Sequence, residues 1–258
     1  MREPFFDDDL VRLYHGHAAE VLAGLASSSV GCIVTSPPYF GLRDYGVAEQ
    51  IGAEPTPELY VTALARVFHE AQRVLKGSGT LWLVMGDSYS SGRRAASNLA
   101  SWASVNGRGG AHRIREAQRG RHGAADLPPK NLMGMPWRVA FALQDDGWIL
   151  RNEIVWVKPN PMPESVKDRF SCTHESIFVF SKSRRYWFDL DALRIPHLMR
   201  PQRRPSGRPA DVTPRLGQPR QSWSTSARDE VGVDGNPAGR NPGDVWTIPT
   251  KPFPAAHF

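Results

Sequence analysis

Cysteines, internal repeats and long hydrophobic runs are scarce or absent in this sequence, and each shortage narrows the class of protein. Only two cysteines occur, Cys32 and Cys172, and they lie far apart without the spacing of paired metal ligands. Cys32 stands inside an apolar run, so we expect it to be a small core residue. No signal peptide or apolar run of membrane length is found, so we expect a cytoplasmic protein without a membrane partner.

Acidic residues are also in deficit. There are 26 Asp and Glu against 32 Lys and Arg, which gives a formal net charge of +6 and a pI near 9.6. This balance predicts an anionic partner, although charge alone does not determine the fold. A chain of 258 residues is long enough for one large domain or for a domain with an insertion.

The segment from Val30 to Tyr39 carries the most specific local signal. A β-branched run typical of a buried parallel strand ends abruptly in Thr-Ser-Pro-Pro-Tyr. Two consecutive prolines cannot continue a strand ladder, so the chain must leave the sheet at its carboxyl edge, where open α/β sheets bind ligands. Taken alone, the turn is also typical of an ordinary strand end with a packed tyrosine.

Hydrophobic periodicity predicts an α/β sheet pattern. Strands are expected at 11–14, 30–35, 80–85, 148–157 and 176–180, and helices at 18–25, 57–75 and 136–145. The last two strands suggest an antiparallel pair at the edge of the sheet. One stripe of apolar residues predicts the buried face of the second helix; its members are Leu59, Ala63, Val67, Ala71 and Leu75.

Gly77 and Gly79 follow a predicted helix and precede a predicted strand. A glycine-rich loop that binds a cofactor phosphate has the opposite order, because it follows a strand and opens a helix. We therefore expect one of these glycines to cap the end of the helix.

Several segments, taken in order, resemble the sequence blocks of the beta-group amino DNA methyltransferases, which methylate cytosine N4 or adenine N6 with S-adenosylmethionine. They cover nearly the whole chain: 13–16, 30–39, 75–87, 130–138, 154–161, 166–182, 244–246 and 252–254. The resemblance implies an α/β, Rossmann-like S-adenosylmethionine-dependent methyltransferase fold that is circularly permuted and carries an inserted basic target-recognition region. It implies a catalytic domain at 1–190 with a basic loop at about 90–128, a target-recognition region at 191–243, and the start of the cofactor-binding half at 244–258.

By this resemblance, Ser36, Pro37, Pro38 and Tyr39 form the catalytic loop. An exocyclic base amine is a poor nucleophile because its lone pair is delocalised into the ring. Hydrogen bonds from the amine to the Ser36 hydroxyl and the Pro37 carbonyl would favour a pyramidal nitrogen and direct its lone pair at the sulfonium methyl. Tyr39 would stack on a base swung out of the duplex.

The resemblance assigns cofactor contacts to His17, Thr35, Ser36, Asp87 and Pro254. The alternative for His17 is a solvated loop histidine, and for Asp87 a helix or turn cap. Relatives usually have Asp where His17 stands, and the family's Phe-x-Gly-x-Gly loop, expected after Phe258, does not occur in the sequence. We therefore expect weak S-adenosylmethionine binding by this polypeptide alone, with a second chain or a missing C-terminal segment supplying the loop.

His174 and Glu175 follow Cys172 closely enough to suggest a zinc site. No second Cys-His pair stands at a suitable spacing, so no metal is predicted and a structural hydrogen bond that supports the loop is favoured.

Basic segments predict contacts with double-stranded DNA. Seven arginines between 93 and 121 stand against one acid, and six between 200 and 220 stand against one. Each segment could hold phosphates, and the second could also read guanine edges; a solvated insertion is the alternative for the first. The predicted DNA-binding residues are Arg43, Arg93, Arg94, Lys167, Arg169, Arg184, Arg185, Arg203 and Arg204.

Ser36 in the first loop position resembles the cytosine-N4 enzymes more than the adenine-N6 enzymes, which favour Asp or Asn. The expected activity is therefore methyl transfer to cytosine N4 in duplex DNA with base flipping, with adenine N6 as the alternative. A further alternative is a catalytically inert DNA-binding remnant. A restriction endonuclease would be a partner of such a methyltransferase.

Overall fold

The computed structural model describes residues 3–90, 127–196 and 238–251. The elements in order are β1 (Phe6–Asp7), β2 (Arg12–Leu13), α1 (Ala18–Ala23), β3 (Val30–Thr35), α2 (Pro57–Val74), β4 (Leu75–Met85), α5 (Met135–Asp145), β5 (Ile149–Val157), β6 (His174–Ser181), α6 (Leu190–Leu193) and β7 (Val245–Thr247). The predicted mixture of helices and strands is confirmed. Predictions for Arg93, Arg94, Arg203, Arg204, Pro254 and most of both basic segments lie outside the described residues.

Contacts divide the chain into two compact units. The first comprises Met1–Trp187 with Asp244–Phe258, and the second comprises Phe188–Gly243. The described part of the second unit contains the short helix α6, which Asp189 caps by accepting a hydrogen bond from the Ala192 amide. A single bridge joins Ile195 and Arg240 in the same unit. The predicted target-recognition region, 191–243, falls in this unit, and its role stays a prediction.

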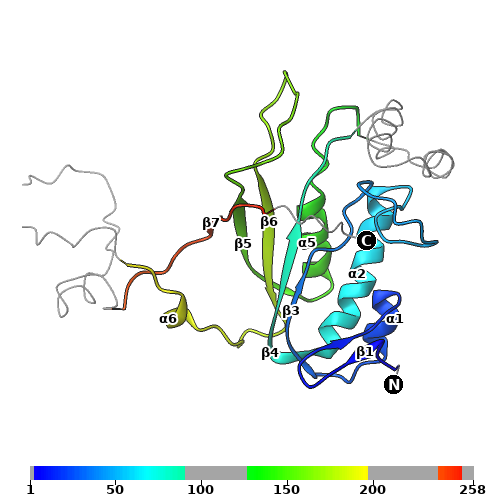
Figure 1. Cartoon of the computed structure of the whole chain (residues 1–258), viewed down its shortest axis with the longest axis vertical. Helices are drawn as coiled ribbons and strands as arrows, with labels where there is room; N and C mark the ends of the chain where they lie inside the picture. The colour runs from blue at the N-terminus through cyan, green and yellow to red at the C-terminus, as the bar shows by residue number, and fades with distance from the viewer. Residues whose placement is uncertain (1–2, 91–126, 197–237, 252–258) are drawn as a thin grey trace, which may run out of the picture. The chain divides into compact units, whose positions relative to one another are not determined.

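A five-stranded mixed sheet in the order β3-β4-β6-β5-β7 organises the first unit (Figure 1). β3 pairs with β4 in parallel, and β6 pairs antiparallel with both β4 and β5. β7 pairs in parallel with β5. All strands except β6 therefore run in one direction, so the segments that follow β3, β4 and β5 emerge at one edge of the sheet. β5 and β6 are antiparallel as predicted, but they are inner strands of the sheet, whose outer strands are β3 and β7.

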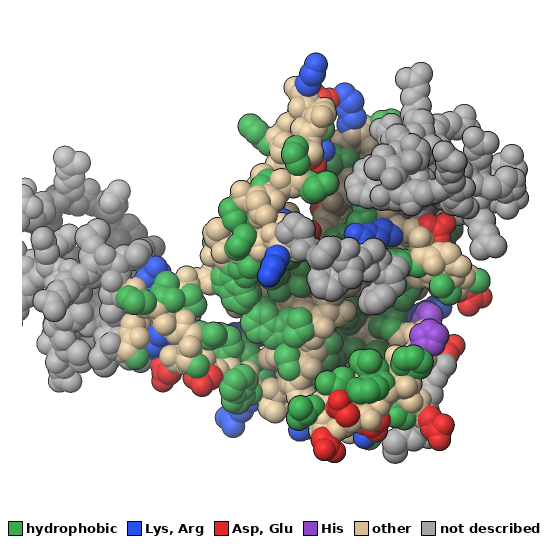
Figure 2. Space-filling model, in the orientation of Figure 1, with side chains coloured by type: hydrophobic (Ala, Val, Ile, Leu, Met, Phe, Trp, Pro, Cys, Tyr) green, Lys and Arg blue, Asp and Glu red, His purple; other side chains and the backbone are tan. Residues whose placement is uncertain are grey.

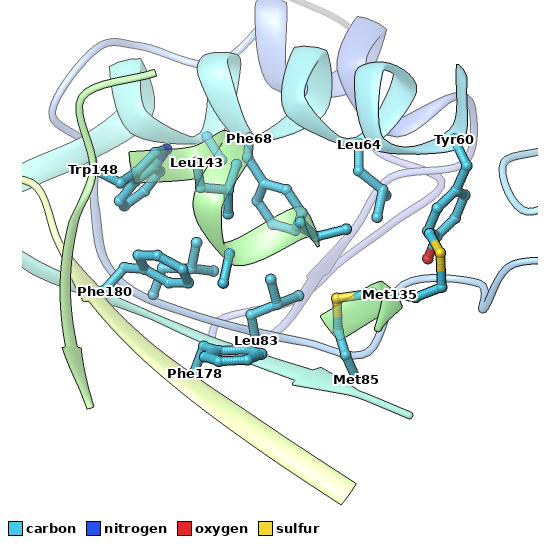
Figure 3. Packing of buried hydrophobic residues seen from close by; sticks show 14 of the residues in the cluster. Tyr60, Leu64, Phe68, Leu83, Met85, Met135, Leu143, Trp148, Phe178 and Phe180 are labelled. Carbon is cyan, nitrogen blue, oxygen red and sulfur yellow. The ribbon is translucent and has the colours of Figure 1, made fainter. Parts of the chain in front are cut away.

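One face of the sheet packs against α2 and α5, and this contact forms the main core. Tyr60, Leu64 and Phe68 point from α2 toward the strands, as Figure 3 shows. They meet Leu83 of β4 and Phe178 and Phe180 of β6; these last three side chains are fully buried. The positions belong to α2, to β4 directly after it and to the distant β6, and burying them stabilises the fold by removing apolar area from water. Further fully buried side chains are Leu75, Leu81, Met85, Met135 and Leu143.

The opposite face of the sheet carries a smaller cluster around Ile154, Ile177 and Val179. Trp82 and Trp246 stack over it with their ring centroids 6.1 Å apart. Figure 2 shows hydrophobic side chains gathered over the strands on the side turned to the viewer. Nearer β3 the cover is thinner, because Val34 is 72% exposed.

The predicted core position of Cys32 is wrong. Cys32 is exposed, and so is Val34 two residues later on the same face of β3. Only Val30 and Ile33 of this strand pack against the main core. β3 is the terminal strand of the described sheet, and no described helix covers its second face, so the apolar run does not indicate burial on both faces.

The predicted capping role of Gly77 and Gly79 is also wrong. α2 ends at Val74, and β4 begins at the next residue with both glycines inside it. The pairing of β3 with β4 shifts register here, from Val30 opposite Leu75 to Cys32 opposite Thr80. A Cβ on Gly79 would lie 2.8 Å from the Gly31 carbonyl oxygen, so the close approach of two strand backbones accounts for this glycine.

The predicted buried stripe of α2 is partly wrong. Val67 and Ala71 are buried, but Leu59 is 50% exposed and Tyr60, Leu64 and Phe68 take the inner positions. A step of four residues turns a helix by about 400°, so a stripe defined only by that step rotates away from the core within a few turns. Thr56 caps this helix by accepting a hydrogen bond from the Leu59 amide.

No helix in the described part of the chain has the length and apolar character to cross a membrane.

Candidate active site

Four segments that are distant in sequence meet at the edge where β3, β4 and β5 end. Ser36 follows β3, Gly86 and Asp87 follow β4, and Lys158 follows β5. β6 begins at this edge, because Ser176 pairs with Met85 and Glu175 pairs with Trp156. Because β3, β4 and β5 run in the same direction, the predicted catalytic loop lies at the same end of the sheet as the residues that follow β4 and β5 and the first residues of β6.

Ser36 and Tyr39 form a chain of hydrogen bonds with Glu175. The exposed Ser36 hydroxyl donates to the Tyr39 hydroxyl oxygen over 3.3 Å. The Tyr39 hydroxyl donates in turn to Oε2 of Glu175 over 2.7 Å. Burial raises the pKa of Tyr39 well above its ordinary value; the nearby Glu175 carboxylate raises it further, although the Ser36 hydrogen bond opposes the rise. Tyr39 therefore stays protonated and remains a donor.

The second half of the loop is anchored to the core. Tyr60, fully buried on α2, donates a hydrogen bond to the Pro38 carbonyl over 2.8 Å. Gly52 packs so closely that a Cβ there would lie 2.9 Å from the Tyr39 carbonyl oxygen, and its φ of +95° also favours glycine. By contrast, no hydrogen bond to the Pro37 carbonyl occurs among the described residues.

The Tyr39 ring lies directly against Gly86. A Cβ on Gly86 would lie 2.8 Å from Cε2 of the ring, closer than real Cβ atoms approach a neighbour, and 3.6 Å from the Glu175 carboxyl carbon. The absence of a side chain after β4 therefore leaves the space that Tyr39 needs to reach Glu175.

Lys158 holds the other oxygen of Glu175. Its ammonium group forms an ion pair with Oε1 of Glu175, and both side chains are only about one fifth exposed. The same ammonium lies 4.8 Å from the centre of the Trp156 ring, and the Lys158 amide donates to the Thr173 carbonyl. Partial burial reduces solvent screening, so this pair constrains the carboxylate more than a surface ion pair would.

Asp87 has a structural role in this arrangement. Its Oδ1 accepts hydrogen bonds from the amides of Ser88 and Met135, and its Oδ2 accepts one from Gly134. Gly134 and Met135 stand at the start of α5, so the carboxylate caps that helix and complements its dipole. The cap that the sequence left as an alternative is therefore present, and the cofactor contact of Asp87 stays a prediction.

Among the other predicted cofactor residues, Thr35 and Ser36 are neighbours in the chain, and His17 belongs to a different segment. Thr35 ends β3 opposite Leu83 and directly precedes Ser36. His17 is exposed and begins α1 without a capping hydrogen bond from its side chain. The cofactor role of Thr35, Ser36 and His17 stays a prediction.

The predicted DNA-binding residues separate into two groups. Lys167 and Arg169 lie in the connection between β5 and β6, at the same edge as Ser36, and Arg43 follows the catalytic loop. Arg169 is already engaged there, because it forms an ion pair with Glu164 and lies 4.0 Å from the centre of the Tyr89 ring. Their role in DNA binding stays a prediction.

Arg184 and Arg185 follow the carboxyl end of β6, which lies at the opposite edge of the sheet. In that turn Lys182 donates to the Leu75 carbonyl and Ser183 donates to the Gly77 carbonyl, so the turn lies beside the beginning of β4. About five strand residues, or roughly 17 Å, separate this edge from the level of Ser36. The structure therefore does not bring these two arginines together with the catalytic loop.

Sequence reasoning found some supporting residues and missed others. We expected the segment around His174 and Glu175 to make a structural hydrogen bond that supports the loop, and Glu175 does accept one from Tyr39. Lys158 and Tyr60 were not singled out as site residues. The Lys-Pro-Asn-Pro run after a predicted strand signalled Lys158, whereas nothing local in sequence distinguishes Tyr60 from any other core tyrosine.

The fold and the site together define an α/β protein with an anchored, hydroxyl-bearing turn at the carboxyl edge of a mixed sheet. A family model described as DNA methylase, for the N6 and N4 methyltransferases, matches residues 30–255. The type II methyltransferase M.XycI of Xanthomonas campestris pv. cyanopsidis is 43% identical over 250 residues, covering 95% of this chain and 67% of the relative. M.Cfr9I of Citrobacter freundii, also a type II methyltransferase, is 41% identical over 246 residues with the same coverage of both chains.

Similarity to solved structures is more distant. A putative DNA modification methylase of Thermus thermophilus, solved with S-adenosyl-L-methionine, matches with 23% identity and a TM-score of 0.43. The match covers 69% of this chain and 56% of that one.

The chain belongs to the N6/N4 DNA methylase family. The resemblance found in the ordered sequence blocks is thereby confirmed, and so is the α/β, Rossmann-like methyltransferase class of the fold.

Proposed function

We propose that this chain carries the catalytic loop of a site-specific DNA methyltransferase that transfers the methyl group of S-adenosylmethionine to an exocyclic amine of a flipped base. The observation that carries the proposal is the exposed Ser36 hydroxyl on a turn anchored by Tyr60 and Glu175. Family membership and the type II methyltransferases among its relatives support the same reaction.

In this reaction Ser36 and the Pro37 carbonyl accept the two N–H groups of the target amine. The prolines restrict the backbone, and the bond from Tyr60 to Pro38 holds the turn on the core, so the acceptors need little reorganisation when the base arrives. S-adenosylmethionine, when bound, supplies a methyl group on a positively charged sulfur. The loop's task is to hold the nitrogen in line with that methyl group.

The described residues fit only part of the cofactor. Thr35 and Ser36 lie at an exposed strand end where a methyl donor could approach, whereas both Asp87 oxygens already accept backbone hydrogen bonds. We therefore expect this polypeptide alone to bind S-adenosylmethionine weakly. Isothermal calorimetry checks this expectation, and tight stoichiometric binding would contradict it.

The target assigned to the loop is cytosine N4, because Ser36 stands where the adenine-N6 enzymes favour Asp or Asn. A hydroxyl and a carboxylate can both accept from an amine, so the loop chemistry alone gives only a preference. Nucleoside analysis of DNA from cells that carry the complete gene tests the assignment. The expected product is N4-methylcytosine, and N6-methyladenine as the sole product would replace cytosine with adenine as the target.

The decisive variant is Ser36→Ala in the enzyme produced from the complete gene. Loss of a preorganised hydrogen-bond partner at the reacting group should lower kcat by about 10²- to 10³-fold while leaving DNA affinity unchanged. Ser29→Ala is the matched control, because Ser29 lies just before β3 at its other end and donates to the Ala26 carbonyl. DNA binding without methylation by the unsubstituted enzyme would instead favour an inert DNA-binding protein.

A further inference from the structure

The Glu175 carboxylate fixes which groups donate and which accept in the hydrogen-bond chain that runs from Ser36 through Tyr39 to Glu175. An ionised carboxylate accepts hydrogen bonds but cannot donate them, so Tyr39 must give its only hydroxyl proton to Glu175. The Tyr39 oxygen is then left with lone pairs, and it accepts the Ser36 proton over 3.3 Å. The Ser36 oxygen therefore presents only lone pairs toward solvent.

We propose that Glu175, held by Lys158 and acting through Tyr39, is a positioning residue that makes Ser36 an obligate hydrogen-bond acceptor for the target amine. This inference rests on the proposed methyl transfer. A serine hydroxyl rotates freely and donates as readily as it accepts. If its proton turned toward the amine, it would occupy the nitrogen lone pair that has to attack the methyl group. Directing that proton to Tyr39 removes the unproductive arrangement.

The surroundings of Glu175 suit this task. Its two oxygens have separate partners, Tyr39 on Oε2 and Lys158 on Oε1. The ion pair and the position of the Lys158 ammonium over the Trp156 ring restrain rotation of the carboxylate. The raised pKa of Tyr39 keeps the donated proton on the tyrosine throughout the neutral range.

A purely structural role for these contacts makes a different prediction. If Glu175 only held the Tyr39 ring against Gly86, removing the Tyr39 hydroxyl would loosen the loop, and melting temperature and KM would change with kcat. If the contacts orient the Ser36 proton, kcat should fall while KM stays the same, even where loss of the hydrogen bond between Tyr39 and Glu175 itself lowers the melting temperature. The two roles can therefore be separated by measurement.

The first test is Tyr39→Phe in the enzyme produced from the complete gene, because this change keeps the ring and its packing on Gly86. We expect kcat to fall about tenfold, the size of one lost net hydrogen bond, with KM for DNA and for S-adenosylmethionine within about twofold of the original values. Tyr186→Phe is the matched control, because Tyr186 accepts a hydrogen bond from Arg151 at the opposite edge of the sheet. Its kcat should not change.

The second test combines Tyr39→Phe with Glu175→Gln. Two residues that act through one chain should not lose activity additively, so the double variant should be no slower than the slower single variant. Glu153→Gln controls for loss of a carboxylate on the neighbouring strand, since Glu153 accepts a hydrogen bond from Ser176 rather than from the loop. Assays are run well below the melting temperature of each variant.

The outcomes separate the two proposals. Absence of methylated bases with the unsubstituted enzyme would overturn the methyltransferase function and this inference with it. A methylating enzyme in which Tyr39→Phe keeps full kcat would overturn this inference alone. Additive losses in the double variant, or a rise in KM for Tyr39→Phe, would assign Glu175 a purely structural role.

Discussion

Serine and other polar side chains lie both where β6 ends and where β3, β4 and β5 end, but they do different things at these two ends of the strands. At the edge where β6 ends, Ser183 and Lys182 donate to backbone carbonyls of β4, so the hydroxyl and the ammonium complete the hydrogen bonding of the fold. At the edge where β3 ends, Ser36 is exposed, and its one partner within the described chain is another side-chain hydroxyl. The difference shows how a polar group can stay accessible while its neighbours are anchored.

Strand direction explains why the exposed Ser36 and its neighbours gather where β3, β4 and β5 end. β3, β4 and β5 run the same way, so three connecting segments leave the sheet together and the start of β6 lies between two of them. The opposite edge receives only the beginnings of these strands, where the chain enters from helices or tight turns.

The largest contrast is expected from alanine substitution at the two ends of β4. Gly86→Ala places a Cβ 2.8 Å from the Tyr39 ring, and overpacking of this kind destabilises a protein by about 1–3 kcal/mol. The displaced ring should also lower methylation. Gly77→Ala at the other end meets nothing within 4 Å and should stay within about 0.5 kcal/mol of the original stability. Urea unfolding measures both, and equal effects would remove the contrast.

A smaller effect is expected from removing the cap of α5 at the edge that carries Ser36. Asp87→Ala should lower the free energy of unfolding by about 1 kcal/mol, because the amides of Gly134 and Met135 lose their acceptor. Asp87→Asn retains one acceptor oxygen and should lose less. Calorimetry of cofactor binding on both variants separates the cap from the predicted cofactor contact: a loss of affinity in Asp87→Asn without loss of stability would support the contact.

The smallest effect is expected in DNA affinity. If DNA approaches the edge that carries Ser36, Lys167→Ala should weaken binding a few-fold and reduce the slope of log K against log salt by about one unit. Arg185→Ala, at the opposite edge, should leave both quantities unchanged. Fluorescence anisotropy over a range of salt concentrations measures the two slopes. A loss confined to Arg185→Ala would place the DNA on the other edge.

Sequence reasoning correctly placed the end of β3, where the signal was local, and the catalytic role of the turn that follows stays a prediction. The Thr-Ser-Pro-Pro-Tyr turn ends a strand and faces solvent because consecutive prolines cannot remain in a ladder. The same approach failed at Gly77, Gly79 and Cys32. Strand register and the position of β3 at the end of the described sheet decide their surroundings, and neither can be seen in the neighbouring residues.

The sequence by itself determined the α/β class, the family and the exposed hydroxyl-bearing turn, since periodicity and proline restrictions act over a few residues. Only the tertiary structure decided that Tyr39 would find Glu175, 136 positions away, and that Lys158 would hold the carboxylate from the other side. Such contacts depend on which strands become neighbours and in which direction they run. They arise from the packing of the whole sheet, which no short stretch of sequence encodes alone.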